Sequence, residues 1–245
     1  MSETMNNELT QDGVEDGHEG GAARRGLSVV QIAVLVAAFA FLGSAIGFVV
    51  GERSNGDPLN TVDVGFMQDM GYHHGQAVQM SLLLLDKAEV DRSLQQFAQE
   101  IIMDQRYEQG VFAATLSRFG HPSEPDKTVM GWMGDPMPID HMMGMATEAQ
   151  MEQLAHLDGD EAEALWIALM CEHHLGGLHM ADYAARHGKD STTTKLAKAM
   201  VKNQRSEVLD IQRYRTRQDL PIPEGFTDPL KDPRLNPISF TEKDD

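Results

Sequence analysis

The stretch MGYHHGQAVQM, residues 70–80, decides the fold of this chain, because it recurs as MCEHHLGGLHM at residues 170–180. Each copy places two adjacent histidines between two methionines at the same spacing. The offset of 100 residues also aligns two further positions, Asp63 with Glu163 and Phe66 with Trp166. The repeat therefore extends beyond the histidines and predicts two related structural units.

A second pair of segments follows the two copies of the histidine motif. AQEIIMDQRYE at 98–108 corresponds to AKAMVKNQRSE at 197–207, and both end in a Gln-x-x-Glu motif. Their apolar residues recur at the three- and four-residue steps of an amphipathic helix. Each half is therefore predicted to be a helical hairpin, with the His pair on its first helix and Gln-x-x-Glu on its second.

The periodicity of the whole region from 60 to 218 is helical, and no stretch alternates convincingly enough for a strand. Four main helices and a shorter one are predicted, at 60–87, 90–119, 160–187, 191–218 and 147–157. Neither hairpin can bury its apolar stripe alone. The sequence therefore predicts an all-α, four-helix bundle made of two repeated hairpins.

The hairpins occupy residues 60–119 and 147–218. The linker between them, 120–146, is long enough to cross from one end of the bundle to the other. After the second hairpin, residues 219–245 contain five prolines and are predicted to form an extended tail.

The N-terminal part of the chain predicts a membrane anchor. Residues 1–26 are acidic and poor in large apolar groups, as in a disordered tail, whereas residues 27–50 carry no charge and are long enough for one transmembrane helix. A signal peptide is the alternative, but its apolar region is usually shorter, about 7 to 15 residues. Because Arg24 and Arg25 precede the apolar stretch, the positive-inside rule predicts a cytoplasmic N-terminus and an extracytoplasmic main domain at the cell membrane.

Composition excludes several classes of function. The formal net charge of -18 argues against a nucleic-acid partner, because phosphate binding needs clustered Lys and Arg. The single cysteine, Cys171, rules out an intramolecular disulfide and Cys-based clusters, whereas the chain has 16 methionines. No nucleophile–base order, phosphate loop or nucleotide fingerprint is recognisable, which favours a binding protein over an enzyme.

Glu108 and Glu207 fall on the apolar faces of their predicted helices, where an unpaired carboxylate is costly to bury. The histidines of the repeated motif are their obvious partners. One interpretation is therefore structural: networks of Glu, His and Gln fix the helix register, and methionine fills the core.

The other interpretation is a metal site, because imidazole, thioether and carboxylate groups are all ligands, and His with Met favours copper, especially Cu(I). A di-iron site is disfavoured, since neither hairpin has the Glu-x-x-His motif of such bundles. The candidate ligands are Met70, His73, His74, Met80, Glu108, Met170, His173, His174, Met180 and Glu207.

The linker holds a second group of candidate ligands within MGWMGDPMPIDHMMGM, residues 130–145. Its glycines and prolines oppose a regular helix, so its methionines are harder to explain as helix core. They predict either a copper site or a hydrophobic strap across the end of the bundle. These secondary candidates are Met130, Met133, Met137, His141, Met142, Met143 and Met145.

The blocks FMQDMGYHHGQAVQM with AQEIIMDQRYEQ, and ALMCEHHLGGLHMA with AKAMVKNQRSEV, resemble the family called domain of unknown function 305, in a tandem, membrane-anchored form. The resemblance covers roughly residues 60–215. It implies a ferritin-like four-helix fold, and some members are linked to copper binding outside the cytoplasm. It points to the His and Met residues of both motifs, with Glu108 and Glu207 beside them. The second copy departs from the usual pattern at Gly176 and Gly177, which predict close helix approach or a weakened second site.

Two functions follow as hypotheses. The first is a membrane-anchored, extracytoplasmic protein that binds or buffers copper. The second is a non-catalytic accessory subunit of a membrane-protein complex, which contacts its partners through the anchor helix and the tails. In that case the polar core only stabilises the bundle.

Overall fold

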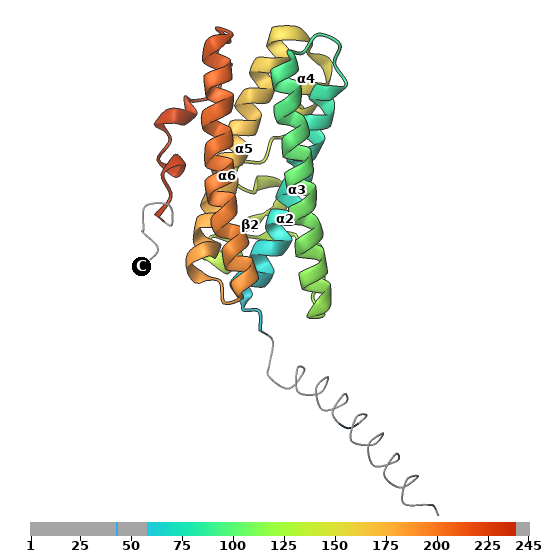
Figure 1. Ribbon diagram of the computed structural model, residues 1–245, viewed down its shortest axis with the longest axis vertical. Helices are drawn as coiled ribbons and strands as arrows, with labels where there is room; N and C mark the ends of the chain where they lie inside the picture. The colour runs from blue at the N-terminus through green and yellow to red at the C-terminus, as the bar shows by residue number, and fades with distance from the viewer. Residues whose placement is uncertain (1–42, 44–57, 239–245) are drawn as a thin grey trace, which may run out of the picture. The chain divides into compact units, whose positions relative to one another are not determined.

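The computed structural model describes Gly43 and residues 58–238, and Asn55–Asp245 form one compact unit (Figure 1). Within this unit, four long helices lie side by side, with a shorter helix at one end of the bundle. The helices are α2 (Thr61–Leu85), α3 (Arg92–Arg118), α4 (Glu148–His156), α5 (Gly159–His187) and α6 (Ser191–Arg217). Every end lies within two residues of its predicted position, and the all-α prediction is confirmed for this part of the chain.

The predicted membrane anchor, 27–50, lies outside the described residues apart from Gly43, as does the predicted tail, 1–26. Among the helices of the described ranges, none combines the length and the apolar character needed to cross a bilayer.

Two buried carboxylates fasten the hairpins together. Asp63 of α2 accepts backbone N–H bonds from Lys189 and Asp190 at the start of α6, at 3.0 to 3.1 Å. Glu163 of α5 accepts the backbone N–H of Asp91 at the start of α3, at 2.6 Å. Both carboxylates satisfy amides that a helix N-terminus leaves unpaired. Each hairpin therefore caps the second helix of the other, which explains the aligned acidic residues at positions 63 and 163.

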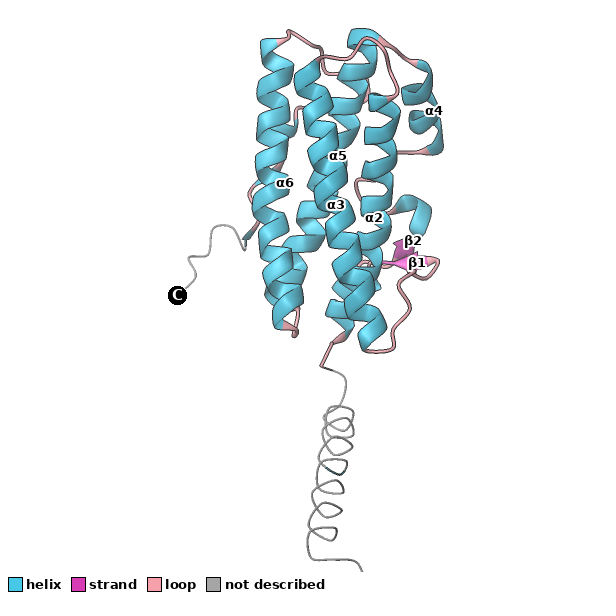
Figure 2. Ribbon diagram, turned by 45° about the vertical axis from the view of Figure 1, so that its right-hand side comes forward, coloured by secondary structure: helices cyan, strands magenta, loops and turns pink. Residues whose placement is uncertain are grey.

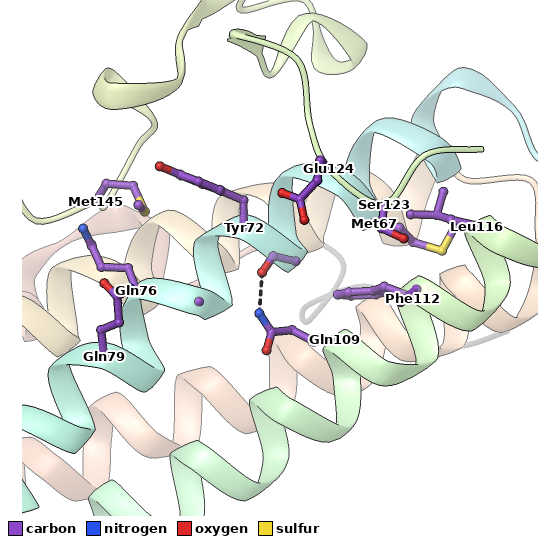
Figure 3. Close-up of a pocket in the computed structure, with 13 residues that line it drawn as sticks. Met67, Tyr72, Gln76, Gln79, Gln109, Phe112, Leu116, Ser123, Glu124 and Met145 are labelled. Atoms are coloured by element: carbon purple, nitrogen blue, oxygen red, sulfur yellow. Dashed lines mark hydrogen bonds between the residues drawn. The ribbon is translucent and has the colours of Figure 1, made fainter.

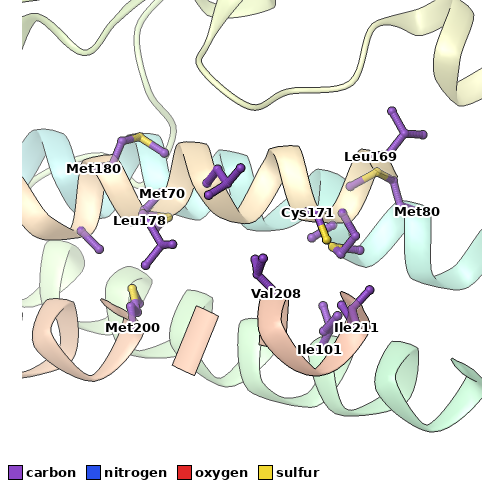
Figure 4. Close-up of a cluster of buried hydrophobic side chains, with 14 of the residues drawn as sticks. Met70, Met80, Ile101, Leu169, Cys171, Leu178, Met180, Met200, Val208 and Ile211 are labelled. Atoms are coloured by element: carbon purple, nitrogen blue, oxygen red, sulfur yellow. The ribbon is translucent and has the colours of Figure 1, made fainter. Parts of the chain in front are cut away.

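Apolar side chains from the four long helices meet in one core, where methionines lie among leucine, isoleucine and valine (Figure 4). Met70 and Met180 lie toward one end of the cluster that is drawn, and Met80 lies toward the other. The largest fully buried side chains include Trp166 and Tyr214. The repeated motifs therefore contribute their methionines directly to the core.

The linker crosses the bundle as predicted, but it lies along the side of the bundle over α2 and α5. The prediction of a strap across the bundle end is therefore wrong. Gln68 of α2 donates to the Pro122 carbonyl of the linker near one end, and Lys87 donates to the Ala155 carbonyl of α4, the helix that follows the linker, near the other. Asp69 and Gln76 of α2 hold the linker between these points. They bind the backbone N–H of Met130, the ring N–H of Trp132, and both backbone polar groups of Ala146.

Part of the linker forms a small antiparallel ladder, β1 (Thr128–Val129) with β2 (Met137–Pro138), which Figure 2 shows beside α2. Short 3₁₀ turns follow each strand, at Gly131–Met133 and Ile139–His141. The sequence does not predict this ladder, because two-residue strands carry no periodic signal.

The described part of the tail packs on α5 and α6 and contains two 3₁₀ turns, at Pro229–Lys231 and Pro233–Leu235. Arg234 of the tail forms an ion pair with Glu172 of α5 at 2.8 Å. Arg205 of α6 donates to the Leu235 carbonyl at 3.0 Å. These contacts fix the tail against the second hairpin.

Candidate metal site

Two histidines from different hairpins meet inside the bundle. His73 of α2 and His173 of α5 stack with their ring centroids 3.6 Å apart and their planes inclined by 28°. His173 Nε2 donates to the backbone carbonyl of His73 at 2.9 Å. Both side chains are buried. Equivalent residues of the two repeats are therefore in direct contact.

The second histidine of each pair faces the glutamate of its own hairpin. His74 Nε2 lies 2.7 Å from a carboxyl oxygen of Glu108, and His174 Nε2 lies 2.7 Å from a carboxyl oxygen of Glu207. Both histidines are fully buried, and the glutamates are buried or nearly so. The prediction that the buried glutamates pair with the facing histidines is confirmed.

The His74–Glu108 pair is uncharged at neutral pH. Burial raises the pKa of Glu108 to about 8, and the negative charge of Glu207 adds to this effect. Burial, together with the positive charge of His174, lowers the pKa of His74 to about 3. At pH 7 a neutral carboxylic acid therefore faces a neutral imidazole.

In the His174–Glu207 pair the carboxylate is ionised, although the distance is the same. Burial alone would raise the pKa of Glu207, but the hydrogen bond from His174 and the positive charge of that ring outweigh burial and lower the pKa. His174 Nδ1 also lies 2.9 Å from the carbonyl of Met170. Both ring nitrogens of His174 therefore have a hydrogen-bond partner.

Three imidazole nitrogens of this centre have no hydrogen-bond partner among the described residues: both nitrogens of His73 and Nδ1 of His74. The backbone of Met143 lies near enough to favour the charged form of His73, but no bond of acceptable geometry joins them. Burial dominates and lowers the pKa of His73 well below its ordinary value. Leaving a buried polar group unpaired is unfavourable by about 1 to 3 kcal/mol. A neutral imidazole keeps one nitrogen with a free lone pair, so His73 has an unpaired nitrogen that a metal ion can use.

The methionines of the repeated motifs lie on the same helices as the histidines. Met70, Met80, Met170 and Met180 are all fully buried. Met70 precedes His73 and His74 by three and four residues, a spacing that brings side chains together on a helix surface. Its thioether is therefore placed both to fill the core and to lie beside the imidazoles.

Cys171 does not offer a thiolate ligand. Burial raises the pKa of its thiol to about 12, although the side-chain amide of Gln212 donates to the sulfur at 3.3 Å. Cys171 therefore behaves as a small buried residue of the second hairpin.

The secondary candidates pack on the bundle as parts of a hydrophobic strap. Met130 and Met142 are buried, His141 is exposed, and the others, Met133, Met137, Met143 and Met145, are partly buried. The strap comes close to the histidines at Met143. A Cβ at Gly176 would overlap the Met143 carbonyl, so glycine is required there. The predicted close approach is therefore real: the neighbour is the linker backbone at Gly176 and the Gln204 side chain of α6 at Gly177.

Sequence reasoning missed three residues that shape this region. Asp69 and Gln76 hold the linker over α2, as described above, and Phe112 of α3 packs 6.1 Å from His74 between ring centroids. Asp69 and Gln76 act on residues more than 60 positions away in the sequence. Spacing along one helix contains no signal for such contacts.

The donor set of this centre fits a soft metal ion better than a hard one. Within residues 58–238, no group of three or more His, Cys, Asp or Glu side chains is arranged to hold a metal ion. A hard cation such as Ca²⁺ prefers several oxygen ligands, whereas the unpaired groups of this centre are imidazole nitrogens. Unpaired imidazole nitrogens with thioethers on the same helix suit a soft ion such as Cu(I).

The fold and this centre define a class: four-helix bundles in which two equivalent hairpins enclose a histidine-rich polar core. The family model described as "Domain of unknown function (DUF305)" matches residues 63–215, and the chain belongs to this family. A single match spans both hairpins. Among curated proteins, no relative matches the chain.

Three solved structures are similar to this chain. A DUF305 protein from Streptomyces coelicolor is 34% identical with a TM-score of 0.60, and the match covers 64% of this chain and 94% of that one. A DUF305 fragment from Deinococcus radiodurans is 29% identical with a TM-score of 0.56, covering 65% and 99%. A third is CopM in the Cu(I)-bound form, 22% identical with a TM-score of 0.49, covering 64% and 96%. The first two support the helical fold of the family domain.

Proposed function

We propose that this protein binds or buffers copper, as Cu(I), where its two hairpins meet. The observation that carries the proposal is His73, which is fully buried, stacks on His173 at 3.6 Å and has no hydrogen bond to either ring nitrogen. Imidazole with thioether is a ligand combination that selects Cu(I). Metal binding would use nitrogens that the metal-free core leaves unpaired.

In this proposal His73 and His74 are the first ligands, because both imidazoles are neutral and each has an unpaired ring nitrogen. Met70 adds its thioether from the same helix. Glu108 holds a proton beside the neutral ring of His74, and a ligating imidazole must be neutral. His174 would have to give up a hydrogen bond to Met170 or Glu207 before it could bind. The remaining core candidates are Met80, Met170, His173 and Met180. Copper is the cargo of this centre, and no reaction is assigned to it.

The linker supplies a second, weaker group of thioethers on the outer side of α2 and α5. We infer that it contributes to copper capture at high metal concentration, because four of its methionines are partly exposed. Replacing Met133, Met137, Met143 and Met145 by Leu preserves volume and removes the thioethers. This variant should keep the core stoichiometry and lose any additional copper.

We further propose that residues 27–50 anchor the protein in the cytoplasmic membrane as one helix, with a cytoplasmic N-terminus. The Streptomyces coelicolor relative is described as a candidate secreted protein, which supports an extracytoplasmic main domain. The acidic net charge of -18 remains unsuited to nucleic acid. A membrane-protein complex would be contacted through the anchor and the tails.

Anaerobic Cu(I) titration of the full-length chain in mild detergent tests the copper proposal. Replacing His73, His74, His173 and His174 together by Ala should remove most of the bound copper. His179→Ala is the matched control, because this histidine lies on α5 but is exposed. Unchanged stoichiometry in the folded quadruple variant would contradict the core site.

Four buried truncations can unfold the bundle, so a milder variant is needed. Met70→Leu with Met170→Leu keeps the side-chain volume and should weaken copper binding by roughly tenfold, about 1.4 kcal/mol, while the fold is retained. Circular dichroism and the melting temperature check the fold. Unchanged affinity in this variant would show that the thioethers only fill space.

The accessory-subunit function is favoured by a specific observation: the two His–Glu pairs at 2.7 Å already satisfy each other without a metal. If this function is correct, protein purified from its native membrane should contain no metal and should co-purify with a partner protein in a fixed ratio. Metal analysis of that preparation separates the two functions.

A further inference from the structure

The two hairpins contain equivalent grooves between their helices, but only the first groove is open among the described residues. The first groove is a cavity of about 390 Å³ between α2, α3 and the linker (Figure 3). The second groove, between α5, α6 and the tail, has about 10 Å³ of free space. The repeat relates the residues that line them: Met67 to Ile167, Gly71 to Cys171, Tyr72 to Glu172, Ala113 to Gln212, and Leu116 to Arg215.

Side chains and the tail fill the second groove. Cys171 lines the second groove and Leu175 is buried one turn further along α5, whereas the first groove is lined by Gly71 and Gly75 at the equivalent positions. The segments after α3 and α6 cover both grooves at equivalent positions, Ser123–Glu124 and Ile222–Pro223. The tail then continues over the second groove through Phe226. The first groove receives no such segment among the described residues.

Packing does not require the two glycines of the first groove. A Cβ at Gly71 would meet Phe112 Cδ2 at 3.8 Å, and one at Gly75 would meet Gln109 Nε2 at 3.7 Å, which are ordinary contacts. Glycine in the middle of a helix lowers stability relative to alanine. Gly71 and Gly75 therefore destabilise α2 without relieving a steric clash. Their effect is to leave the cavity open, because side chains at these two positions would occupy its floor.

The cavity leads from solvent toward His74. Its rim is exposed at Tyr72, Gln79 and Glu124, and its inner wall is the buried ring of Phe112. Figure 3 shows Phe112 and Gln109 on α3 facing the cavity, with Glu124 reaching over it from the linker. Phe112 lies 6.1 Å from His74 between ring centroids. One aromatic side chain therefore separates the cavity from the buried imidazole.

The lining of the cavity suits a soft cation. Among the described residues that form it, none is Lys or Arg, and Glu124 is its one ionisable acid. Met67 and Met145 add thioethers at separate places along it. Negative charge attracts a cation, and thioether sulfur binds Cu(I).

We infer that this cavity is the route by which Cu(I) reaches His74 and His73, with Phe112 as the side chain that must move to admit it. The inference rests on the proposed copper function and adds the route and the rate at which Cu(I) enters the site. Because the equivalent groove beside the second hairpin is closed, the first hairpin loads first. Movement of one buried aromatic ring then sets the loading rate.

Stopped-flow transfer of Cu(I) from a coloured chelator to the full-length chain in detergent tests this route. Gly75→Leu installs the residue of the second hairpin and should slow uptake by about tenfold at unchanged stoichiometry. Gly110→Leu is the matched control, because Gly110 is a mid-helix glycine of α3 that does not line the cavity and whose Cβ would meet nothing within 4 Å. Phe112→Leu should accelerate uptake.

The outcomes separate the route from the function. If the wild-type chain takes up no Cu(I), the copper function is overturned and the route with it. If the wild type loads normally and Gly75→Leu loads equally fast, the route alone is overturned. Should Gly75→Leu fail to fold, the double variant Gly71→Ala with Gly75→Ala narrows the same floor and is read in the same way.

Discussion

The first and second hairpins build the same contact in two different chemical states. In both, a buried imidazole lies 2.7 Å from the glutamate one helix away. In the first hairpin this pair is neutral, one imidazole nitrogen of His74 is unpaired, and an open cavity lies behind Phe112. In the second, His174 is bonded at both nitrogens and the equivalent groove is filled.

This difference teaches that a repeated motif does not repeat its environment. Glu108 and Glu207 lie near enough for the charge of one to raise the pKa of the other, so a single negative charge between them is favoured. Glu207 keeps the charge because the hydrogen bond from His174 and the electrostatic effect of that ring outweigh its burial. The second hairpin is thereby satisfied without metal, and the first is left able to bind.

The largest predicted effect distinguishes the two glutamates. Glu207→Gln removes an ionised carboxylate that is paired with the buried His174 ring and should lower the free energy of unfolding by about 3 kcal/mol at pH 7. Glu108→Gln replaces one neutral group by another of similar shape and should cost about 1 kcal/mol or less. Urea unfolding of the metal-free full-length chain measures both. Equal losses would mean that the two pairs carry the same charge.

The glycines of the two motifs should respond to alanine with opposite signs. Gly176→Ala places a Cβ against the Met143 backbone, which cannot move like a flexible side chain, and should cost about 2 to 3 kcal/mol. Gly75→Ala meets only an ordinary contact and should stabilise the protein by about 1 kcal/mol. Thermal unfolding of the two variants provides the measurement. Destabilisation by Gly75→Ala would contradict the claim that a Cβ fits at Gly75 without a steric clash.

The smallest predicted effect is the pH dependence of the metal-free protein. The pKa of Glu108 rises on folding from 4.5 to about 8, so the folded state binds more protons between these values and stability falls as pH rises through this window. His73, His74 and His173 have lowered pKa values, so stability also falls as pH drops below 6.5.

Together these shifts place maximal stability near pH 6.5 and predict a loss of up to about 2 kcal/mol between pH 6.5 and 8, from one proton at about 1.4 kcal/mol per pH unit. In Glu108→Gln, stability should no longer fall between pH 6.5 and 8, and its fall below pH 6.5 should be unchanged. Melting temperatures across this range give the test. A retained alkaline slope in Glu108→Gln would assign that proton to another group.

Helix positions and the His–Glu pairs follow from the sequence for physical reasons. Apolar periodicity is local, so all five described helices end within two residues of their predicted ends. Burial of Glu108 and Glu207 follows from their place on an apolar helix face, and a buried carboxylate needs a partner. The repeat then leaves the histidines as the residues able to supply one.

The sequence by itself therefore determined the hairpins, the polar core and the residues that meet there. The tertiary structure decided which glutamate keeps its proton, why Gly176 must be glycine, and which groove stays open. These properties depend on neighbours more than 30 residues away, such as the linker beside Gly176 and the tail beside Cys171. Desolvation and packing act through space, and a pattern read along one helix cannot contain them.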